Sequence, residues 1–303
     1  MTRAASPATG PREGLKEALD RLYVEYNRAE AVADPVEIVR RYPDRRDREV
    51  VGFCAAGLAF GRVASVLQSV ERVLNVLGPS PAAFVREFDP VRDGEAFGPL
   101  VHRWTRGDDL IALVLALRRM IDEAGSIEGF FLQGHDAARP DVEASLESFS
   151  SRALALLAAA RKARPTGVSY FFPRPSTGSA CKRLNLYLRW MVRSDSVDLG
   201  AWSGVSPSQL IVPLDVHVIR LGQCLGLTRY KSPGWKMASE ITASLRRMDP
   251  ADPVRYDFAL CHVGMRDQCG FNRPFGDSRC PLRGWCRSGR HTRPASPRPS
   301  GPR

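Results

Sequence analysis

Apolar side chains recur at helical spacing along most of this chain, and no segment sustains the apolar–polar alternation of a half-buried strand. The segment 108–123 (DDLIALVLALRRMIDE) is the clearest case, with acidic residues at its start and one apolar face. Similar patterns predict helices over 14–29, 35–41, 50–60, 62–77, 79–88, 141–162, 234–247 and 253–265. The sequence therefore predicts an all-α protein, with a charged turn at 41–48 and a proline-rich break at 164–179.

Length and composition fit one globular unit with flexible ends. At 303 residues, with 44% hydrophobic and 25% charged residues, the chain can bury a substantial core. We expect a helical domain over 14–286, a disordered N-terminus over 1–13 and a disordered tail over 287–303 rich in arginine, proline and serine. No apolar run reaches the length of a transmembrane helix and no signal peptide is recognisable, so the expected location is the cytoplasm.

The net charge of +11 comes partly from those ends. The tail 287–303 alone carries five arginines and no acidic residue. Such an arm binds phosphates without sequence preference, although a solvated tail explains the charge equally well. Charge alone therefore permits a nucleic-acid partner without establishing one.

The segment 181–227 contains the residues to which we assign chemistry. It predicts a helix that begins at Lys182, a turn-rich connection, and a second helix that begins at Asp215 behind Pro213. A partly buried amine at the positive end of a helix dipole is shifted toward the uncharged form that attacks carbon. A nearby carboxylate can accept a proton and stabilise a cationic sugar in the transition state. Alternatively, the two residues are a surface lysine and a helix cap, and both are common.

The scarcity of lysine makes Lys182 more informative. Only five of the 44 basic residues are lysines, so arginine supplies the positive charge almost everywhere. A lysine inside a regularly patterned helix is then a candidate for a role that a guanidinium group cannot fill, such as amine nucleophile.

The order of motifs around these two residues resembles the helix-hairpin-helix superfamily of DNA glycosylases. The stretch K-R-L-N-L-Y-L-R-W-M-V-R, then D-L-G-x-W, then P-S-x-L-I-V-P-L-D-x-H-V is similar to the archaeal-type 8-oxoguanine glycosylase branch. It is also similar to a bacterial family of unassigned function related to that branch. The likeness extends over 40–286 and is specific around Lys182 and Asp215. It implies two helical subdomains with the active site in the cleft between them.

This resemblance implies a DNA repair glycosylase with AP-lyase activity on an oxidised purine such as 8-oxoguanine. The damaged base would be flipped out of the duplex, and Lys182 would displace it and form a Schiff base with the deoxyribose. Asp215 would be the acidic partner, and β-elimination would nick the strand without a metal. The implied partner is double-stranded DNA containing a damaged base, bound by a monomer at the nucleoid.

The hairpin that holds a DNA phosphate in that superfamily is altered here. Its usual form is L-P-G-V-G-x, whereas 202–208 reads W-S-G-V-S-P-S, with one glycine and a proline. An aromatic patch at 170–172 and Phe60 either lines a base pocket or packs in the core. His217 and the arginines also fit ordinary structural or surface positions. The candidate DNA-contacting residues are Arg62, Arg183, Arg189, Gly204, Ser206, Ser208 and His217.

Four of the seven cysteines cluster near the end of the domain. They are Cys261, Cys269, Cys280 and Cys286, spaced C-x7-C-x10-C-x5-C. The ending C-P-L-R-G-W-C resembles the iron–sulfur loop C-x6-C-x2-C-x5-C of endonuclease-III-like glycosylases, which implies a [4Fe–4S] cluster that positions DNA. Asp277 stands where that loop has its second cysteine, so Cys261 would have to supply the fourth thiolate. A cluster, a zinc ion and a metal-free loop all stay open.

Two other functions compete with a glycosylase for oxidised purines. A non-catalytic DNA- or RNA-binding protein on the same scaffold is favoured by the altered hairpin, whereas the presence of both Lys182 and Asp215 favours an enzyme. A glycosylase for another lesion, or for single-stranded or RNA substrates, is the third alternative.

Overall fold

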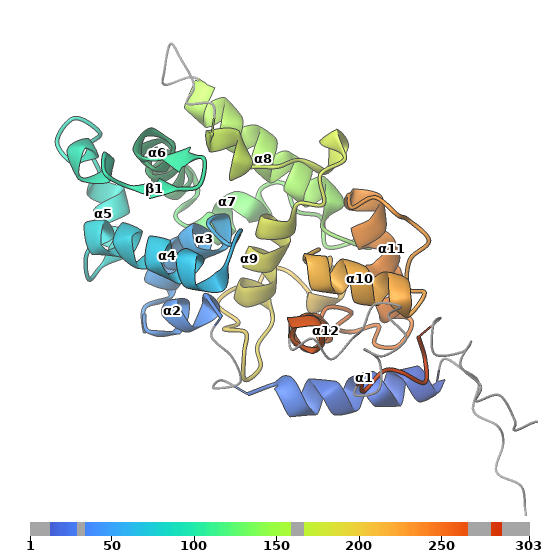
Figure 1. Cartoon of the computed structure of the whole chain (residues 1–303). Helices are drawn as coiled ribbons and strands as arrows, with labels where there is room; N and C mark the ends of the chain where they lie inside the picture. The colour runs from blue at the N-terminus through green and yellow to red at the C-terminus, as the bar shows by residue number, and fades with distance from the viewer. Residues whose placement is uncertain (1–12, 29–33, 159–166, 266–279, 287–303) are drawn as a thin grey trace, which may run out of the picture.

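The computed structural model describes residues 13–28, 34–158, 167–265 and 280–286 (Figure 1). These ranges form twelve α-helices and one two-stranded hairpin, so the predicted all-α class is confirmed. None of the helices in these ranges is both long enough and apolar enough to cross a lipid bilayer. Of the ends predicted to be disordered, 1–13 and 287–303, Glu13 begins α1, and the other residues lie outside the described ranges, as does Cys269.

The helices are α1 (Glu13–Tyr26), α2 (Val36–Arg40), α3 (Arg45–Gly57), α4 (Val63–Leu77), α5 (Pro81–Glu87), α6 (Gly107–Ala124), α7 (Ile127–Leu132), α8 (Glu143–Ala158), α9 (Lys182–Val192), α10 (Val216–Cys224), α11 (Trp235–Arg246) and α12 (Asp257–Met265). Short 3₁₀ turns are η1 (Gly94–Phe97), η2 (Val168–Tyr170), η3 (Pro175–Thr177) and η4 (Pro207–Gln209).

Local capping signals set several helix starts. The Asp44 side chain accepts hydrogen bonds from the backbone N–H groups of Arg46 (2.7 Å) and Asp47 (3.3 Å), so α3 begins at Arg45. The predicted charged turn over 41–48 is therefore wrong beyond residue 44. The short α7, capped by Ser126, was not predicted, because six residues are too few to establish a helical period.

One hairpin departs from the predicted absence of strands. β1 (Val101–His102) pairs antiparallel with β2 (Thr105–Arg106) around the two-residue loop Arg103–Trp104. Arg103 adopts the left-handed backbone conformation (φ 55°), which costs a residue with a side chain about 1–2 kcal/mol. The loop lacks the Asn-Gly or Asp-Gly signal of such turns, so the sequence gives no sign of it.

His102 attaches this hairpin to the loop before α4 and to α4 itself. Its buried ring places Nε2 3.0 Å from the carbonyl oxygen of Phe60 and Nδ1 2.9 Å from the hydroxyl of Ser69. Because a carbonyl can only accept, Nε2 carries the proton and Nδ1 accepts from the hydroxyl. Burial lowers the pKa of His102, which favours this neutral form.

The helices α2 to α8, which we call the first helix group, enclose an aromatic core, and α9 closes it. The buried rings are Phe53, Phe130, Phe131, Phe149 and Phe172. Tyr187 of α9 meets Phe53 edge-on, with 5.1 Å between ring centroids. Gly52 allows this approach, because a Cβ there would lie only 2.9 Å from the Met191 side chain of α9.

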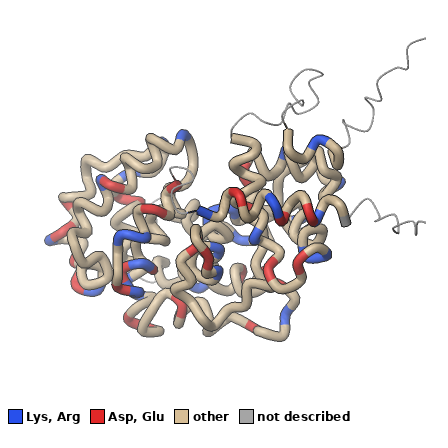
Figure 2. Tube along the Cα trace, turned by 90° about the horizontal axis from the view of Figure 1, so that it is seen from below, with Lys and Arg blue, Asp and Glu red and all other residues tan. Residues whose placement is uncertain are grey.

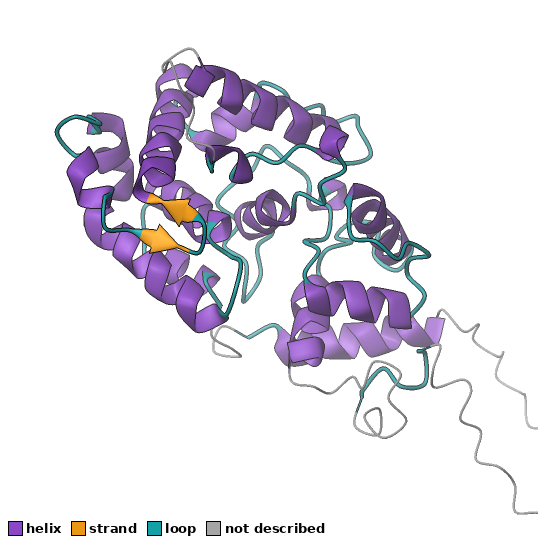
Figure 3. Cartoon of the chain, turned by 45° about the horizontal axis from the view of Figure 1, so that its top comes forward, coloured by secondary structure: helices purple, strands orange, loops and turns teal. Residues whose placement is uncertain are grey.

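A second group of helices, α1 and α10 to α12, lies on the other side of α9 in both views (Figures 1 and 3). The first and last described helices pack together in this group. The Tyr256 hydroxyl, just before α12, donates to Asp20 of α1 (2.7 Å), and the Tyr26 ring stacks on His262 with centroids 5.9 Å apart. The described chain thus forms two helix groups with α9 between them.

Candidate functional site

Lys182 begins α9, as predicted, and its amine reaches the first helix group. Cys181 precedes it in a left-handed conformation (φ 48°), and the Cys181 carbonyl accepts the first helical hydrogen bond from Asn185 (2.9 Å). The half-buried Lys182 donates from Nζ to the carbonyl oxygen of Ala59 (3.3 Å), between α3 and α4. Among the described residues this neutral carbonyl is its only partner, so no carboxylate holds the amine in an ion pair.

Asp215 caps α10, again as predicted. One carboxylate oxygen accepts from the backbone N–H of Val218 (2.7 Å), which satisfies one of the open donors at the start of the helix. The other oxygen accepts from the thiol of Cys261 on α12 (2.7 Å). Asp215 as a residue is partly exposed.

Lys182 and Asp215 do not touch each other. No hydrogen bond or ion pair joins them in the described part of the chain. Asp215 belongs to an acidic group that includes Asp257, whose pKa is raised to about 7 mainly by burial and further by Asp215. Asp257 pairs with Arg189 of α9 (2.5 Å), seven residues and so about 10 Å along the helix from Lys182. Any joint action of the two predicted catalysts would therefore pass through a bound substrate.

An aromatic cluster of Phe60, Trp104 and Tyr170 lies next to Lys182. The ring of Phe60 stacks on Trp104 with 4.7 Å between centroids and 20° between planes, and Tyr170 lies 5.6 Å from Trp104. Phe60 directly follows Ala59, the partner of the Lys182 amine. Trp104 and Tyr170 are each 48% exposed, so the cluster offers ring surface to solvent. The prediction named Phe60 and Tyr170 but missed Trp104, because its hairpin was not foreseen.

Arg183 is held inside this cluster. Its guanidinium group lies over the rings of Phe60 (5.4 Å) and Tyr170 (5.9 Å) and donates to the Gly57 carbonyl (3.3 Å). Burial lowers the pKa of Arg183 to about 10. Arg183 thus anchors the aromatic cluster to α9, and its contact with DNA stays a prediction.

The expected DNA contact of Arg189 is wrong. Its side chain is only 3% exposed and forms ion pairs with Asp198 (3.1 Å) and Asp257 (2.5 Å). One turn later, Arg193 pairs with Asp195 (2.8 Å) and, at a shorter distance, with Asp198. These buried charges neutralise one another, so Arg189 is a structural ion-pair residue that no DNA phosphate can reach.

The expected phosphate contact of Gly204 is wrong as well, because a carboxylate of the protein already occupies its N–H group. One oxygen of Glu128 accepts from the backbone N–H groups of Ser203 and Gly204, each at 2.8 Å. Arg45 forms an ion pair with the other oxygen. A Cβ at Gly204 would lie 2.5 Å from Leu132, so close packing against α7 explains the glycine.

Ser206 and Ser208 follow in the same turn. Their hydroxyl groups lie 2.7 Å apart, and the Ser206 hydroxyl accepts from the backbone N–H of Ser208 (3.3 Å). Both remain near the surface, and their contact with DNA stays a prediction.

His217 packs against α12 rather than beside Asp215. A Cβ on Gly264 would lie 2.6 Å from the His217 side chain, and the buried Nδ1 has no hydrogen-bond partner in the described part of the chain. Asp215 accepts from Val218 and Cys261 instead, so His217 does not orient it. Arg62, by contrast, is exposed at the start of α4.

Three of the four predicted metal ligands, Cys261, Cys280 and Cys286, lie within the described residues. The Cys261 thiol donates to Asp215, and burial, together with that carboxylate, raises its pKa well above the usual range. Both effects oppose the thiolate form that a cluster needs, so Cys261 does not fit as a ligand. Cys280 and Cys286 are buried, and no group of three or more His, Cys, Asp or Glu within the described ranges could hold a metal ion. A site that includes Cys269 stays a prediction.

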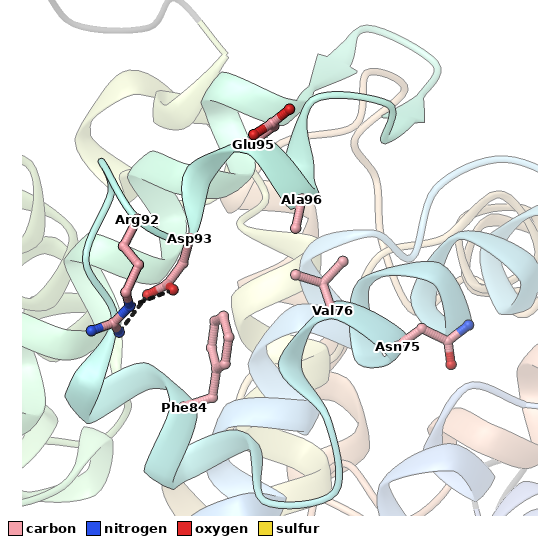
Figure 4. Close-up of a pocket in the computed structure, with 7 residues that line it drawn as sticks. All are labelled: Asn75, Val76, Phe84, Arg92, Asp93, Glu95 and Ala96. Atoms are coloured by element: carbon pink, nitrogen blue, oxygen red, sulfur yellow. Dashed lines mark hydrogen bonds and ion pairs between the residues drawn. The ribbon is translucent and has the colours of Figure 1, made fainter.

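Two open pockets lie on the first helix group. One of about 600 Å³ lies between α4, α5 and η1, where Arg92 faces Asp93 in an exposed ion pair (2.7 Å) and Phe84 and Val76 supply apolar walls (Figure 4). The other, of about 380 Å³, lies between α4 and the hairpin and is lined by Phe60 and Arg62 among others. The first pocket carries a neutralised pair of charges, and the second lies beside the aromatic cluster.

Comparisons with known proteins give one match. A family model described as "Protein of unknown function (DUF2400)" matches residues 34–266, from α2 to the end of α12. No curated protein and no solved structure matches the chain.

Proposed function

The chain belongs to the DUF2400 family, and we propose that it is a DNA repair glycosylase with AP-lyase activity on an oxidised purine. In this proposal Lys182 is the Schiff-base nucleophile, Asp215 is its acidic partner, and double-stranded DNA with a damaged base is the substrate. The protein would act as a monomer at the nucleoid in the cytoplasm. The chemistry needs no metal, whatever the cysteine loop binds.

One observation carries this proposal. Lys182 presents an amine that no carboxylate of the described residues neutralises, at the start of a helix and next to exposed aromatic rings. A structural lysine usually has an acidic partner or extends into solvent. Within the described ranges the half-buried amine is bound only to the Ala59 carbonyl at 3.3 Å, a weak hydrogen bond that an incoming electrophile can replace.

The reaction follows from the amine. Once the damaged base is flipped out, Nζ of Lys182 attacks C1′ with its lone pair, and the bond from C1′ to the base breaks. The base leaves with the bonding electron pair and takes up a proton. Opening of the sugar ring leaves a C1′=N imine on Lys182 and a hydroxyl at O4′. Loss of a C2′ proton then breaks the C3′–O bond, which cleaves the strand.

Asp215 would act on the sugar from the side opposite to Lys182. The carboxylate of this partly exposed residue can stabilise positive charge that develops on the deoxyribose as the base leaves. The hydrogen bond from Cys261 fixes one oxygen, so the carboxylate has a set orientation before substrate binds. Because Lys182 and Asp215 do not touch, each can contact a different side of the same sugar.

Borohydride trapping tests this proposal directly. Duplex DNA with 8-oxoguanine or an abasic site is incubated with the full chain and borohydride, which reduces an imine to a stable amine. We expect a covalent adduct with the native protein and none with Lys182→Gln. Lys236→Gln, which alters an exposed lysine on α11, is the matched control and should trap normally. An adduct that persists in Lys182→Gln would assign the nucleophile to another residue.

A non-catalytic nucleic-acid-binding protein is the second candidate. The Glu128 carboxylate bound to Ser203 and Gly204 favours it, because this turn cannot hold a phosphate while the carboxylate is there. Binding of lesion-containing DNA without an adduct or base release on any lesion would support this second candidate over the first.

A further inference from the structure

The 380 Å³ pocket beside the aromatic cluster has a strongly basic rim. Arg62 lies at the start of α4, Arg72 lies further along the same helix, and Arg103 lies at the tip of the hairpin. All three side chains are exposed. We call these three residues and the hollow between them the arginine pocket.

The charges of the arginine pocket are not neutralised by the residues that the structure describes. None of its three guanidinium groups forms an ion pair with an acidic residue in the described ranges. Glu71, next to Arg72 in sequence, instead pairs with Arg41 (2.6 Å). Three like charges around one hollow repel one another and create a positive potential that an external anion relieves.

The fold holds Arg103 in this position at a local cost. Its backbone is in the left-handed region (φ 55°), where a residue with a side chain is strained. Gly61 packs against the Arg103 side chain, because a Cβ at Gly61 would be 3.2 Å from a guanidinium nitrogen of Arg103. The backbone of Gly61 has φ 110°. His102 fixes the hairpin through the Phe60 carbonyl and Ser69. A strained arginine that is rigidly supported indicates a binding position.

The neighbours of the pocket indicate the class of ligand. Phe60 lines both the pocket and the aromatic cluster, and Arg103 lies 5.4 Å from the ring centroid of Trp104. Guanidinium groups bind phosphate with their fork of N–H donors, and exposed aromatic rings stack nucleobases. A pocket for phosphate next to a surface for a base matches one unpaired nucleotide of a nucleic-acid strand.

We propose that the arginine pocket binds a backbone phosphate of an unpaired nucleotide in DNA, whose base packs on the exposed rings of Trp104 and Tyr170. The choice of DNA rests on the proposed function, whereas the phosphate and stacking chemistry do not. The nucleotide would lie beside the site of Lys182, because Ala59, Phe60 and Gly61 link the amine to the pocket. The pocket would thus hold the opened strand while the lysine reacts.

Fluorescence anisotropy with labelled oligonucleotides tests this inference on the full chain. The probes are a single strand, a duplex with an abasic site and a fully paired duplex of the same sequence. We expect the triple variant Arg62→Gln/Arg72→Gln/Arg103→Gln to bind the first two at least roughly tenfold more weakly, with a salt slope reduced by roughly 0.7 on the single strand, as expected for the loss of one phosphate contact. Trp104→Ala should weaken binding of the same two probes by roughly tenfold.

A charge-matched control separates the pocket from general electrostatics. The triple variant Arg21→Gln/Arg28→Gln/Arg247→Gln removes the same charge from exposed positions near α1 and α11, and it should bind nearly as the native protein does. Equal losses in both triple variants would overturn the inference. So would an equal loss on the fully paired duplex, because the pocket would then not distinguish an unpaired nucleotide. Melting temperatures of all variants confirm that each is folded.

The inference and the proposed function fail in different ways. If no lesion gives an adduct but the arginine pocket variant still loses binding, the catalytic proposal fails and the pocket stands. If adducts form and the pocket variant binds every probe normally, the pocket is overturned and the catalytic proposal stands.

Discussion

Two groups of arginines in this protein have opposite surroundings. Arg189 on α9 and Arg193, which directly follows that helix, are buried, and each pairs with at least two aspartates. The three arginines of the arginine pocket are exposed and have no acidic partner in the described part of the chain. Figure 2 shows basic and acidic positions mixed along the trace of the described chain. A region of uniform charge therefore does not separate the two groups of arginines.

The difference shows which arginines the fold needs and which it leaves available. A buried guanidinium must be paired, because an isolated charge in a protein interior is very costly. An exposed guanidinium is hydrated and needs no partner, but three around one pocket repel one another. Substitution of the buried arginines should therefore destabilise the folded protein. Substitution of the exposed arginines should weaken ligand binding.

The largest expected effect is on the buried pair. Arg189→Met would leave Asp198 and Asp257 without their shared partner, and we expect a loss of about 3–5 kcal/mol in the free energy of unfolding. Urea denaturation followed by circular dichroism measures it. Arg247→Met on the surface is the control and should change stability by less than about 0.5 kcal/mol. A change below about 1 kcal/mol in Arg189→Met would show that the network is not essential.

A smaller effect is expected at the carboxylate that occupies the 203–204 turn. Glu128→Gln keeps the shape but removes the charge that accepts from Ser203 and Gly204 and pairs with Arg45. We expect a loss of about 1–3 kcal/mol in the same denaturation experiment. Glu71→Gln breaks an exposed ion pair and should cost at most about 1 kcal/mol. Equal effects in the two variants would contradict the structural role of Glu128.

The hairpin that carries Arg103 should respond to acid. Burial lowers the pKa of His102, so its neutral form stabilises the folded state at pH values above the ordinary pKa of about 6.5. This contribution is lost as the pH falls through the lowered pKa. Urea midpoints at neutral and mildly acidic pH should differ less in His102→Gln than in the native chain. An unchanged difference would exclude His102 as the titrating group.

The smallest effect on stability is expected in the arginine pocket itself. Single substitutions Arg62→Gln and Arg72→Gln should change the free energy of unfolding by less than about 0.5 kcal/mol, since no protein partner is lost. Removing one of three like charges should shift the value slightly toward greater stability. Thermal melting at low salt gives the measurement. A clear loss of stability would mean that these arginines have partners within the fold.

The sequence predicts the helix starts at Lys182 and Asp215 because those signals are local. Helical periodicity and a capping aspartate each need only a few neighbouring residues. The burial of Arg189 and the occupation of Gly204 depend on Asp257 and Glu128, which lie 68 and 76 positions away. Trp104 joined the site through a hairpin without a turn signal. Local patterns thus locate the elements, and only tertiary contacts decide which charges are available.

The packing of α1 against α12 also determines the order in which the two helix groups can form during synthesis. Helix α1 cannot bury its Tyr26 face against α12 until α12, some 230 residues later, has emerged from the ribosome. At synthesis rates of ~5–20 residues per second, that delay is roughly 10–50 s. During this interval the α2–α8 group can form its own aromatic core, while the α12 surface that packs on α1 is still missing. The second helix group, with Asp215 and Cys261, is completed only when α12 has been synthesised.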